Sequence, residues 1–350
     1  KISKKDLHRF WKENKDNLRK ENTERIEGIL CYMGEDVLPE TGSLVMVRGS
    51  FRAFAHATNP GEFDAADYYQ ILGQQGKILD GSLLSKSSVH DVFREKLYQV
   101  REYLSLLLDA CYGAEDASVM KAMLLGEKGM LDAKIKKLYQ ANGIIHILTV
   151  SGLHLSVIGM GCHRLLCRIR LPYIVNIIFC SGLMYCYGAM TGMGISMLRA
   201  YVMFAMRLAA GLLGRTYDLL TAVTVSALII LLQWPLYLKH SGFLFSFGAV
   251  CGIGLLLPAV QQNLFGKSSA EKALLSGAAI SLSTLPVYLC FYYEFPPYSV
   301  LLNLVVVPCM TLVLLCGLLS LGLAACFLPL GVAVAYPAHL FLEFYAKCCQ

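Results

Sequence analysis

Charged residues are scarce in this chain. They make up 16% of its 350 residues, whereas soluble domains carry about 25%. The scarcity is greatest near the end, where Ser299 to Ala338 contains neither a charged residue nor a histidine. A helix rises about 1.5 Å per residue and the hydrocarbon core of a bilayer is about 30 Å thick, so this stretch can cross a membrane twice. The composition excludes an ordinary soluble domain.

Sequence motifs of several enzyme classes are also missing. The chain contains no G-x-x-x-x-G-K-[ST] loop for a nucleoside triphosphate and no G-x-S-x-G turn for a nucleophilic serine. Most of its 13 cysteines lie in apolar segments, where cysteine serves as a small packing residue. Cys162 and Cys167 lack partners at zinc-finger spacing. We therefore expect no catalytic residue, no metal and no cofactor.

Apolar runs fill the second half of the chain. The fold class we predict is mainly α, a polytopic helical membrane protein of about eight transmembrane helices with a small β module ahead of them. Residues 298–349 should hold two or three of these helices, broken near Pro308, Pro329 and Pro337. The other spans are expected at residues 144–161, 171–190, 195–213, 219–238, 242–260 and 273–293.

The first part of the chain is polar and divides into three segments. Residues 1–24 predict a charged helical leader without the apolar run of a signal peptide, and the absence of an initial Met suggests a piece of a longer protein. Residues 25–96 contain short β-like runs at 26–32, 44–51 and 77–79, separated by turn residues. Residues 97–143 predict two amphipathic helices on the membrane surface, with Asp116 and Asp132 as N-caps. Residues 144–350 form the transmembrane domain.

The loop charges predict the orientation in the membrane. The second, fourth and sixth connections between spans contain only Lys239. The first, third and fifth should face the cytoplasm, because they contain Arg164, Arg168, Arg170, Arg215, Lys267 and Lys272. The β module then lies outside the cell, where Cys31 and Cys111 have the opportunity to form a disulfide.

A long motif opens the transmembrane domain. Residues 143–154 read G-I-I-H-I-L-T-V-S-G-L-H, which resembles the first core span of the ComEC family of competence proteins, with a pattern close to G-I-x-H-L-L-A-x-S-G-L-H. The resemblance covers roughly residues 25 to 308. Further matches follow in the family's order at Asn59-Pro60-Gly61-Glu62-Phe63-Asp64, Tyr68-Tyr69, Gly126-Glu127, Ser196 with Arg199-Ala200, Gly242-Phe243 with Ser246-Phe247, Thr284-Leu285-Pro286, and Asn303-Leu304 with Pro308.

The resemblance implies a bacterial inner-membrane channel that carries single-stranded DNA into the cytoplasm during natural transformation. It also implies an OB-like outer domain, a cytoplasmic helicase and an extracytoplasmic DNA-receptor protein as partners. Many members add a metallo-β-lactamase-like nuclease domain with an H-x-H-x-D-H motif. The eight histidines here include no pair two residues apart, so we expect that domain to be absent. Two departures stand out: the strands before the Asn-Pro-Gly turn are few, and Leu244 replaces a frequent Gln.

Five residues are candidates for the DNA path. Ser151 and His154 lie three apart near the middle of the first span, with Gly152 between them, so they either line the conduit or fix helix packing. Arg199 follows a run of small residues and either meets DNA phosphates or reaches the lipid headgroups. Pro286 and Asn303, with Pro308, should interrupt helices beside a cavity or only kink them. His146 is expected at the membrane interface.

Two other function classes compete with the channel. Broken helices also fit a transporter of a small anionic solute. A membrane assembly platform for a separate nuclease or helicase is the third hypothesis. The bilayer is a partner in all three.

The topology gives a first prediction. Cysteines introduced into residues 39–96 of a chain cleared of native cysteines should react with an impermeant maleimide in intact cells, because that module is expected outside. A cysteine at Arg168 should react only after the cells are opened. Labelling at position 168 in intact cells, with none in the module, would overturn the orientation.

Overall fold

The computed structural model describes residues 28–33, 39–59, 61–127, 129, 131–141, 148–263, 268–293 and 299–349. The predicted leader at 1–24, Pro60 and His146 lie outside these residues. The chain divides into two compact units, residues 1–100 and 101–350, which are described separately.

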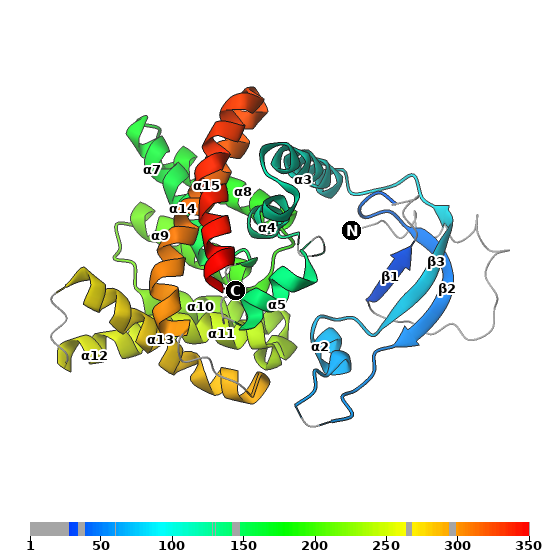
Figure 1. Cartoon of the computed structure of the whole chain (residues 1–350), viewed down its shortest axis with the longest axis horizontal. Helices are drawn as coiled ribbons and strands as arrows, with labels where there is room; N and C mark the ends of the chain where they lie inside the picture. The colour runs from blue at the N-terminus through cyan, green and yellow to red at the C-terminus, as the bar shows by residue number, and fades with distance from the viewer. Residues whose placement is uncertain are drawn as a thin grey trace. The chain divides into compact units, whose positions relative to one another are not determined.

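The first unit is built on a three-stranded sheet in the order β1-β3-β2 (Figure 1). β1 (Ile29–Met33) runs parallel to the central strand β3 (Gly76–Lys86), and β2 (Val45–Ala53) runs antiparallel to it. A short helix, α2 (Ala65–Ile71), connects β2 to β3. Asp64 caps this helix by accepting a hydrogen bond from the backbone N–H of Asp67 at 2.9 Å.

The third strand is much longer than the sequence pattern predicts. The sequence predicts a short apolar run at residues 77–79. Instead the strand continues through Asp80 and Gly81, with Asp80 at a φ of 52° and a register shift against both neighbours. Such a bulge bends a strand without ending it. Among the described residues the sheet has three strands, fewer than the five of an OB barrel.

The second unit is helical and has the composition of a membrane body. Within the described residues, six helical segments are long and apolar enough to span a bilayer. They are Tyr173–Met190 (α8), Ile195–Leu212 (α9), Ser241–Gln261, Glu271–Phe291 (in α13), Leu301–Cys326 (in α14) and Leu328–Tyr345 (in α15). The segment Ser241–Gln261 combines α11 (Ser241–Cys251), a π-helical turn and most of α12 (Leu257–Asn263). The chain is therefore a polytopic helical membrane protein with a small β module, as predicted.

Two predicted spans have different bounds in the part of the chain that the structure describes. Helix α10 (Leu219–Gln233) is apolar but has only 15 residues, and a 3-10 turn at Pro235–Lys239 follows it. The predicted span at 144–161 begins outside the described residues, and its helix starts only at Gly152. This helix consists of three consecutive segments: α6 (Gly152–Leu155), a π-helical turn (Ser156–Met160) and α7 (Gly161–Arg168).

Of the breaks predicted near Pro308, Pro329 and Pro337, the structure has the one near Pro329, where one helix ends at Cys326 and the next begins at Leu328. Pro286 lies inside α13 (Ser269–Phe291), Pro308 inside α14 (Ser299–Cys326) and Pro337 inside α15 (Leu328–Cys349). The helices are therefore not interrupted at Pro286, Asn303 or Pro308, and the alternative that these residues only kink them stays a prediction. Helices tolerate proline inside membranes because neighbouring groups satisfy the freed carbonyls. Pro329 is the second residue of α15, where a proline costs no hydrogen bond.

Helix α4 (Ala114–Leu125) lies in the core of the second unit. Every residue from Ala117 to Leu125 is buried, and the helix contributes to the same apolar cluster as α14 and α15. Gly317 of α14 permits the close approach, since a Cβ there would lie 3.0 Å from Leu124 Cδ1. The prediction of a surface helix over residues 116–141 is therefore wrong: α4 is internal, and α5 (Ala133–Ala141) is a separate helix.

The ends of these helices differ from the prediction at one point and agree at another. Gly113, not Asp116, is the N-cap of α4, and Gly126 ends it at a φ of 73°. Asp132 precedes α5 and accepts a hydrogen bond from the backbone N–H of Lys134 at 2.9 Å, as an N-cap does.

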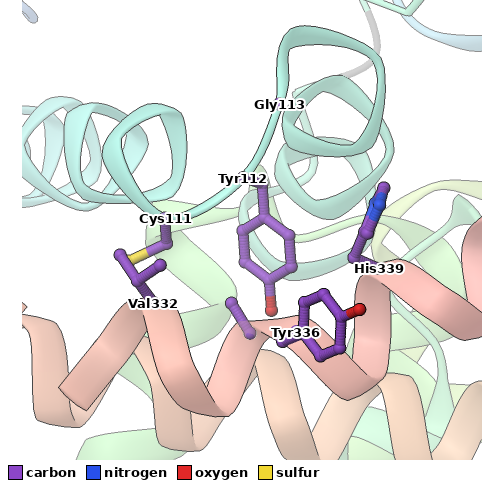
Figure 2. A pocket seen from close by; sticks show the side chains of 7 residues that line it. Cys111, Tyr112, Gly113, Val332, Tyr336 and His339 are labelled. Carbon is purple, nitrogen blue, oxygen red and sulfur yellow. The ribbon is translucent and has the colours of Figure 1, made fainter. Parts of the chain in front are cut away.

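The connection from α3 (Val92–Cys111) to α4 packs against α14 and α15. Figure 2 shows Tyr112 pointing toward α15, between Val332 and Tyr336, and its hydroxyl lies 3.3 Å from Ser320 Oγ of α14. The connection and α15 together line a small pocket, and His339 of α15 lies at its edge. There His339 forms an ion pair with Asp116. Cys111 lines the pocket as a free thiol, and Cys31 is also free, so the disulfide considered above is not formed in this structure.

A buried cation ties α4 to α3. Lys121 is 8% exposed, and its ammonium donates a hydrogen bond of 2.6 Å to Asp109 Oδ2. Arg101 makes a similar bond of 2.7 Å to Glu127 Oε1. The charges of Lys121 and Glu127 led to the incorrect prediction of a surface helix, because the composition does not show that both residues have partners on α3.

The burial of Lys121 predicts an asymmetry between two substitutions. Asp109→Ala leaves a buried ammonium without its partner and should lower the free energy of unfolding by about 1–3 kcal/mol. Lys121→Met removes the cation while keeping its length and should cost less than about 1 kcal/mol. Thermal unfolding of the purified variants in one detergent measures both. A larger loss for Lys121→Met than for Asp109→Ala would contradict this account of α4.

Candidate functional site

Ser151 and His154 form the start of α6. Ser151 has an extended backbone and caps the helix, since its Oγ accepts from the backbone N–H of Leu153 at 3.3 Å. His154 Nδ1 accepts in return from the backbone N–H of Ser151 at 3.1 Å. This reciprocal pair is a capping box with histidine in the place that Glu or Gln usually takes. The two residues therefore lie at a helix end and not near the middle of a helical span as predicted.

His154 is enclosed by protein. Its side chain is 2% exposed. Because Nδ1 is an acceptor, the neutral ring carries its proton on Nε2. Nε2 is buried and has no hydrogen-bond partner among the described residues. The hydrogen bonds that His154 makes through Nδ1 fix the start of α6.

Arg199 lies one turn into α9 and points into the helical unit. It is 9% exposed. Its Nε donates to Ser246 Oγ of α11 (Ser241–Cys251) at 2.8 Å, and its guanidinium lies 5.8 Å from the centre of the Phe247 ring. Nη1 contacts Met203 Sδ at 3.4 Å. A side chain that reaches the lipid headgroups would not be enclosed in this way, so the structure does not support that alternative.

Gly152 brings α6 against this arginine. A Cβ at Gly152 would lie 3.7 Å from Arg199 Nη2 and 3.9 Å from Ala200 Cβ. The start of α6, the first turns of α9 and the middle of α11 therefore meet at one place. We call Gly152, Arg199, Ser246 and Phe247 the arginine site. All four belong to motifs that the sequence analysis singled out.

Helix α11 supplies the floor of the arginine site. His240 caps it by accepting from the backbone N–H of Gly242 at 2.9 Å. Phe243 and Phe247 are both buried, with ring centroids 4.2 Å apart. On its other side α11 packs closely on α13, where Ser283 Oγ donates to the carbonyl of Gly248 at 2.7 Å. Phe247 and His240 were not predicted as site residues, although Phe247 stands next to Ser246 in the motif.

The remaining path candidates lie elsewhere. Pro286 and Pro308 are exposed on their helices and take no part in the arginine site. Asn303 is half-buried on α14, with its Oδ1 buried and unpaired among the described residues. The sequence analysis also missed Asn176, a fully buried residue of α8 that donates to the carbonyl of His163 in α7 at 3.2 Å. A lone Asn in an apolar run was the signal that pointed to it.

The Asn-Pro-Gly motif of the first unit forms a hydrogen-bonded turn. Glu62 Oε2 accepts from the backbone N–H groups of Thr58 and Asn59, each at 3.3 Å, and these bonds lower the pKa of Glu62. Gly61 has a φ of 84°, which favours glycine. The backbone N–H of Asp67 likewise lowers the pKa of Asp64. The role of Asn59 and Gly61 here is structural.

One group of side chains near this turn has the donor types of a metal site. His56, Asp64 and Asp67 each place a ligand atom within 4.8 Å of the others. Asp64 already accepts from the backbone of Ala57 and Asp67 and from His56, and His56 is exposed. We assign the group to capping of α2.

Comparison with known proteins finds a family model that matches most of the second unit. The family model described as "Competence protein" matches residues 123–350. Over 294 residues the chain is 26% identical to ComE operon protein 3 of Bacillus subtilis, covering 82% of this chain and 37% of that protein. Over 246 residues it is 27% identical to competence protein ComA of Neisseria gonorrhoeae, covering 67% of this chain and 35% of that protein.

The chain spans little more than a third of the length of each of these two curated relatives. No solved structure matches it significantly. The family model covers well over half of the chain and contains every helix of the arginine site. The chain therefore belongs to the competence-protein family, the ComEC family that the motif at residues 143–154 resembles.

Proposed function

We propose that this chain is the conduit for single-stranded DNA in a bacterial competence system, and not an enzyme. The helical unit would stand in the cell membrane with the β module outside. Relatives that are named as competence proteins support a part in DNA uptake, and the arginine site supports the more specific role.

The observation that carries the proposal is a buried cation without a counter-ion. Among the described residues no carboxylate lies within ion-pair distance of Arg199, whose partners are a hydroxyl, a thioether and an aromatic ring. A charge inside a membrane-spanning bundle is costly and marks a functional site by default. A guanidinium in this state attracts an anion, and it binds the oxygens of a phosphate diester in a bidentate manner.

Neutral partners also suit a moving ligand. Conduction requires binding that is strong enough to draw the ligand in and weak enough to release it. A carboxylate beside Arg199 would cancel the charge that a phosphate needs. Ser246 and Phe247 hold the guanidinium in place without doing so, and each passing nucleotide offers one negative charge.

His154 is a positioning residue in this proposal. Its Nδ1 accepts the hydrogen bond that fixes the start of α6, and Gly152 of that start lies against Arg199. A conduit needs other proteins to deliver the DNA strand and to provide the energy for its movement. We propose an extracytoplasmic DNA receptor and a cytoplasmic helicase as these partners. A small anionic solute is the alternative ligand, because the same cation would attract it.

Substitutions of Arg199 test the conduit. Arg199→Gln removes the charge and should lower uptake of a labelled single-stranded oligonucleotide into proteoliposomes at least tenfold. Arg199→Lys keeps the charge but loses the planar fork, so its uptake should fall between those of Arg199→Gln and the parent. Because the site is buried, we expect little change in these ratios between low and moderate salt.

Arg215→Gln is the matched control, since Arg215 is exposed in the loop after α9. It should leave uptake within twofold of the parent at equal protein level. Equal oligonucleotide uptake by Arg199→Gln and the parent would remove Arg199 from the path. Flux of a small anion that depends on Arg199, without any flux of DNA, would favour the solute transporter.

The role of His154 gives a separate prediction. His154→Ala removes the reciprocal cap and a buried ring, so protein level and DNA uptake should fall together. His154→Gln keeps an acceptor at the position where capping boxes use Gln and should restore both to at least half of the parent values. Immunoblotting and transformation frequency in the same cells measure the two. Normal protein level with lost uptake in His154→Gln would show instead that the imidazole itself contacts DNA.

A further inference from the structure

A second cationic feature lies in a groove away from the arginine site. The groove encloses about 390 Å³ and is bordered by three helices. The π-helical turn and α7 provide one wall, α9 provides another, and α14 contributes Leu315. Its lining residues are Ser156, Val157, Met160, Gly161, Arg164, Arg207 and Leu315.

The backbone explains why the groove is open. A π-helical turn is wider than an α-helical one and adds a residue to the helix, and it occupies Ser156–Met160. Gly161 follows at once, and a Cβ built there would meet no atom within 4 Å. The wall contributed by this helix is therefore hollow where a regular helix with a larger residue would fill it.

Two arginines from different helices line this space. Arg164 of α7 and Arg207 of α9 are both exposed. Among the described residues neither has a carboxylate within ion-pair distance. Arg207 lies over the ring of Tyr217 at 5.8 Å, which limits its motion without neutralising it. The groove thus combines two available guanidinium groups with an apolar lining of Val157, Met160 and Leu315.

We propose that this groove binds an anionic phospholipid, with the phosphate on Arg164 and Arg207 and the start of an acyl chain along the apolar lining. This site goes beyond the proposed conduit and does not depend on it. A guanidinium pair matches the oxygens of a phosphate diester, and basic pockets between transmembrane helices on the cytoplasmic side suit acidic headgroups.

The surroundings favour a lipid over a DNA strand. Leu165 is 59% exposed and Ile169 is 63% exposed, and they alternate with Arg164, Arg168 and Arg170 along the same segment. A surface that mixes exposed aliphatic side chains with arginines is typical of a helix at the headgroup level of an acidic leaflet. The loop charges predict this segment on the cytoplasmic side. A DNA path would not need exposed leucine and isoleucine beside it.

Native mass spectrometry of the full chain tests the proposal. Protein purified in a neutral detergent would be titrated with phosphatidylglycerol and, separately, with phosphatidylcholine. The parent should retain phosphatidylglycerol at lower lipid concentration than phosphatidylcholine. The double variant Arg164→Gln/Arg207→Gln should need about tenfold more phosphatidylglycerol, since each arginine near an acidic lipid contributes a several-fold effect.

The double variant Arg168→Gln/Arg215→Gln is the control. It loses the same charge from exposed arginines that do not line the groove and should change retention less than twofold. Arg207→Lys, which keeps the charge and loses the fork, should be intermediate and gives a second test if the groove double variant folds poorly.

Three results would overturn the lipid site. An equal loss in the groove and control variants would mean general surface attraction. Equal retention of phosphatidylglycerol and phosphatidylcholine by the parent would mean that the protein does not distinguish an anionic from a zwitterionic headgroup. Unchanged lipid retention in the groove variant, with a lost affinity for a thymidine oligonucleotide, would assign the groove to nucleic acid.

Discussion

Polar groups buried in an apolar helical unit must find partners inside the protein, and this constraint organises the second unit. Serine and threonine side chains donate to carbonyls of their own helices, as Ser226 does to Val223 at 2.7 Å and Thr284 to Ile280 at 2.9 Å. Helix starts are capped by side chains where water would be scarce, at Ser151 for α6 and His240 for α11. Arg199 differs from these groups because it carries a charge and its partners are all neutral.

The sequence predicted most of the membrane helices because their apolar runs end at charges and glycines. Helix α9 begins at Ile195, as predicted, and ends one residue early. Prediction from charge and apolar pattern failed for α4, because Lys121 and Asp116 suggested a solvent-exposed helix. Both charges have partners on other helices, Asp109 and His339, and such tertiary pairing leaves no periodic signal. Pro286 and Pro308 misled for a related reason, since packing decides whether a proline ends a membrane helix.

The site was predictable in its parts and not in its assembly. Gly152, Arg199 and Ser246 stood in motifs, but a single sequence does not show that they meet. Arg199 and Ser246 are 47 positions apart and lie on helices separated by α10 along the chain. The extended backbone of Ser151 was equally hidden, because an apolar run around it suggested a continuous span. In this capping box His154 takes the position of the usual Glu or Gln, so the sequence lacks the residue that normally indicates a helix start.

The cost of holding Arg199 in an apolar environment has to be offset by its surroundings. Phe243 and Phe247 pack on each other and give α11 a rigid face beneath the guanidinium. Gly252, in the π-helical turn that follows α11 (Gly252–Leu256), allows a close approach to α13, since a Cβ there would lie 2.9 Å from the carbonyl oxygen of Ala279. Ser283 adds a hydrogen bond across the same contact. Tight packing behind α11 therefore keeps Ser246 and Phe247 at the arginine, so that the charge stays placed while no fixed anion neutralises it.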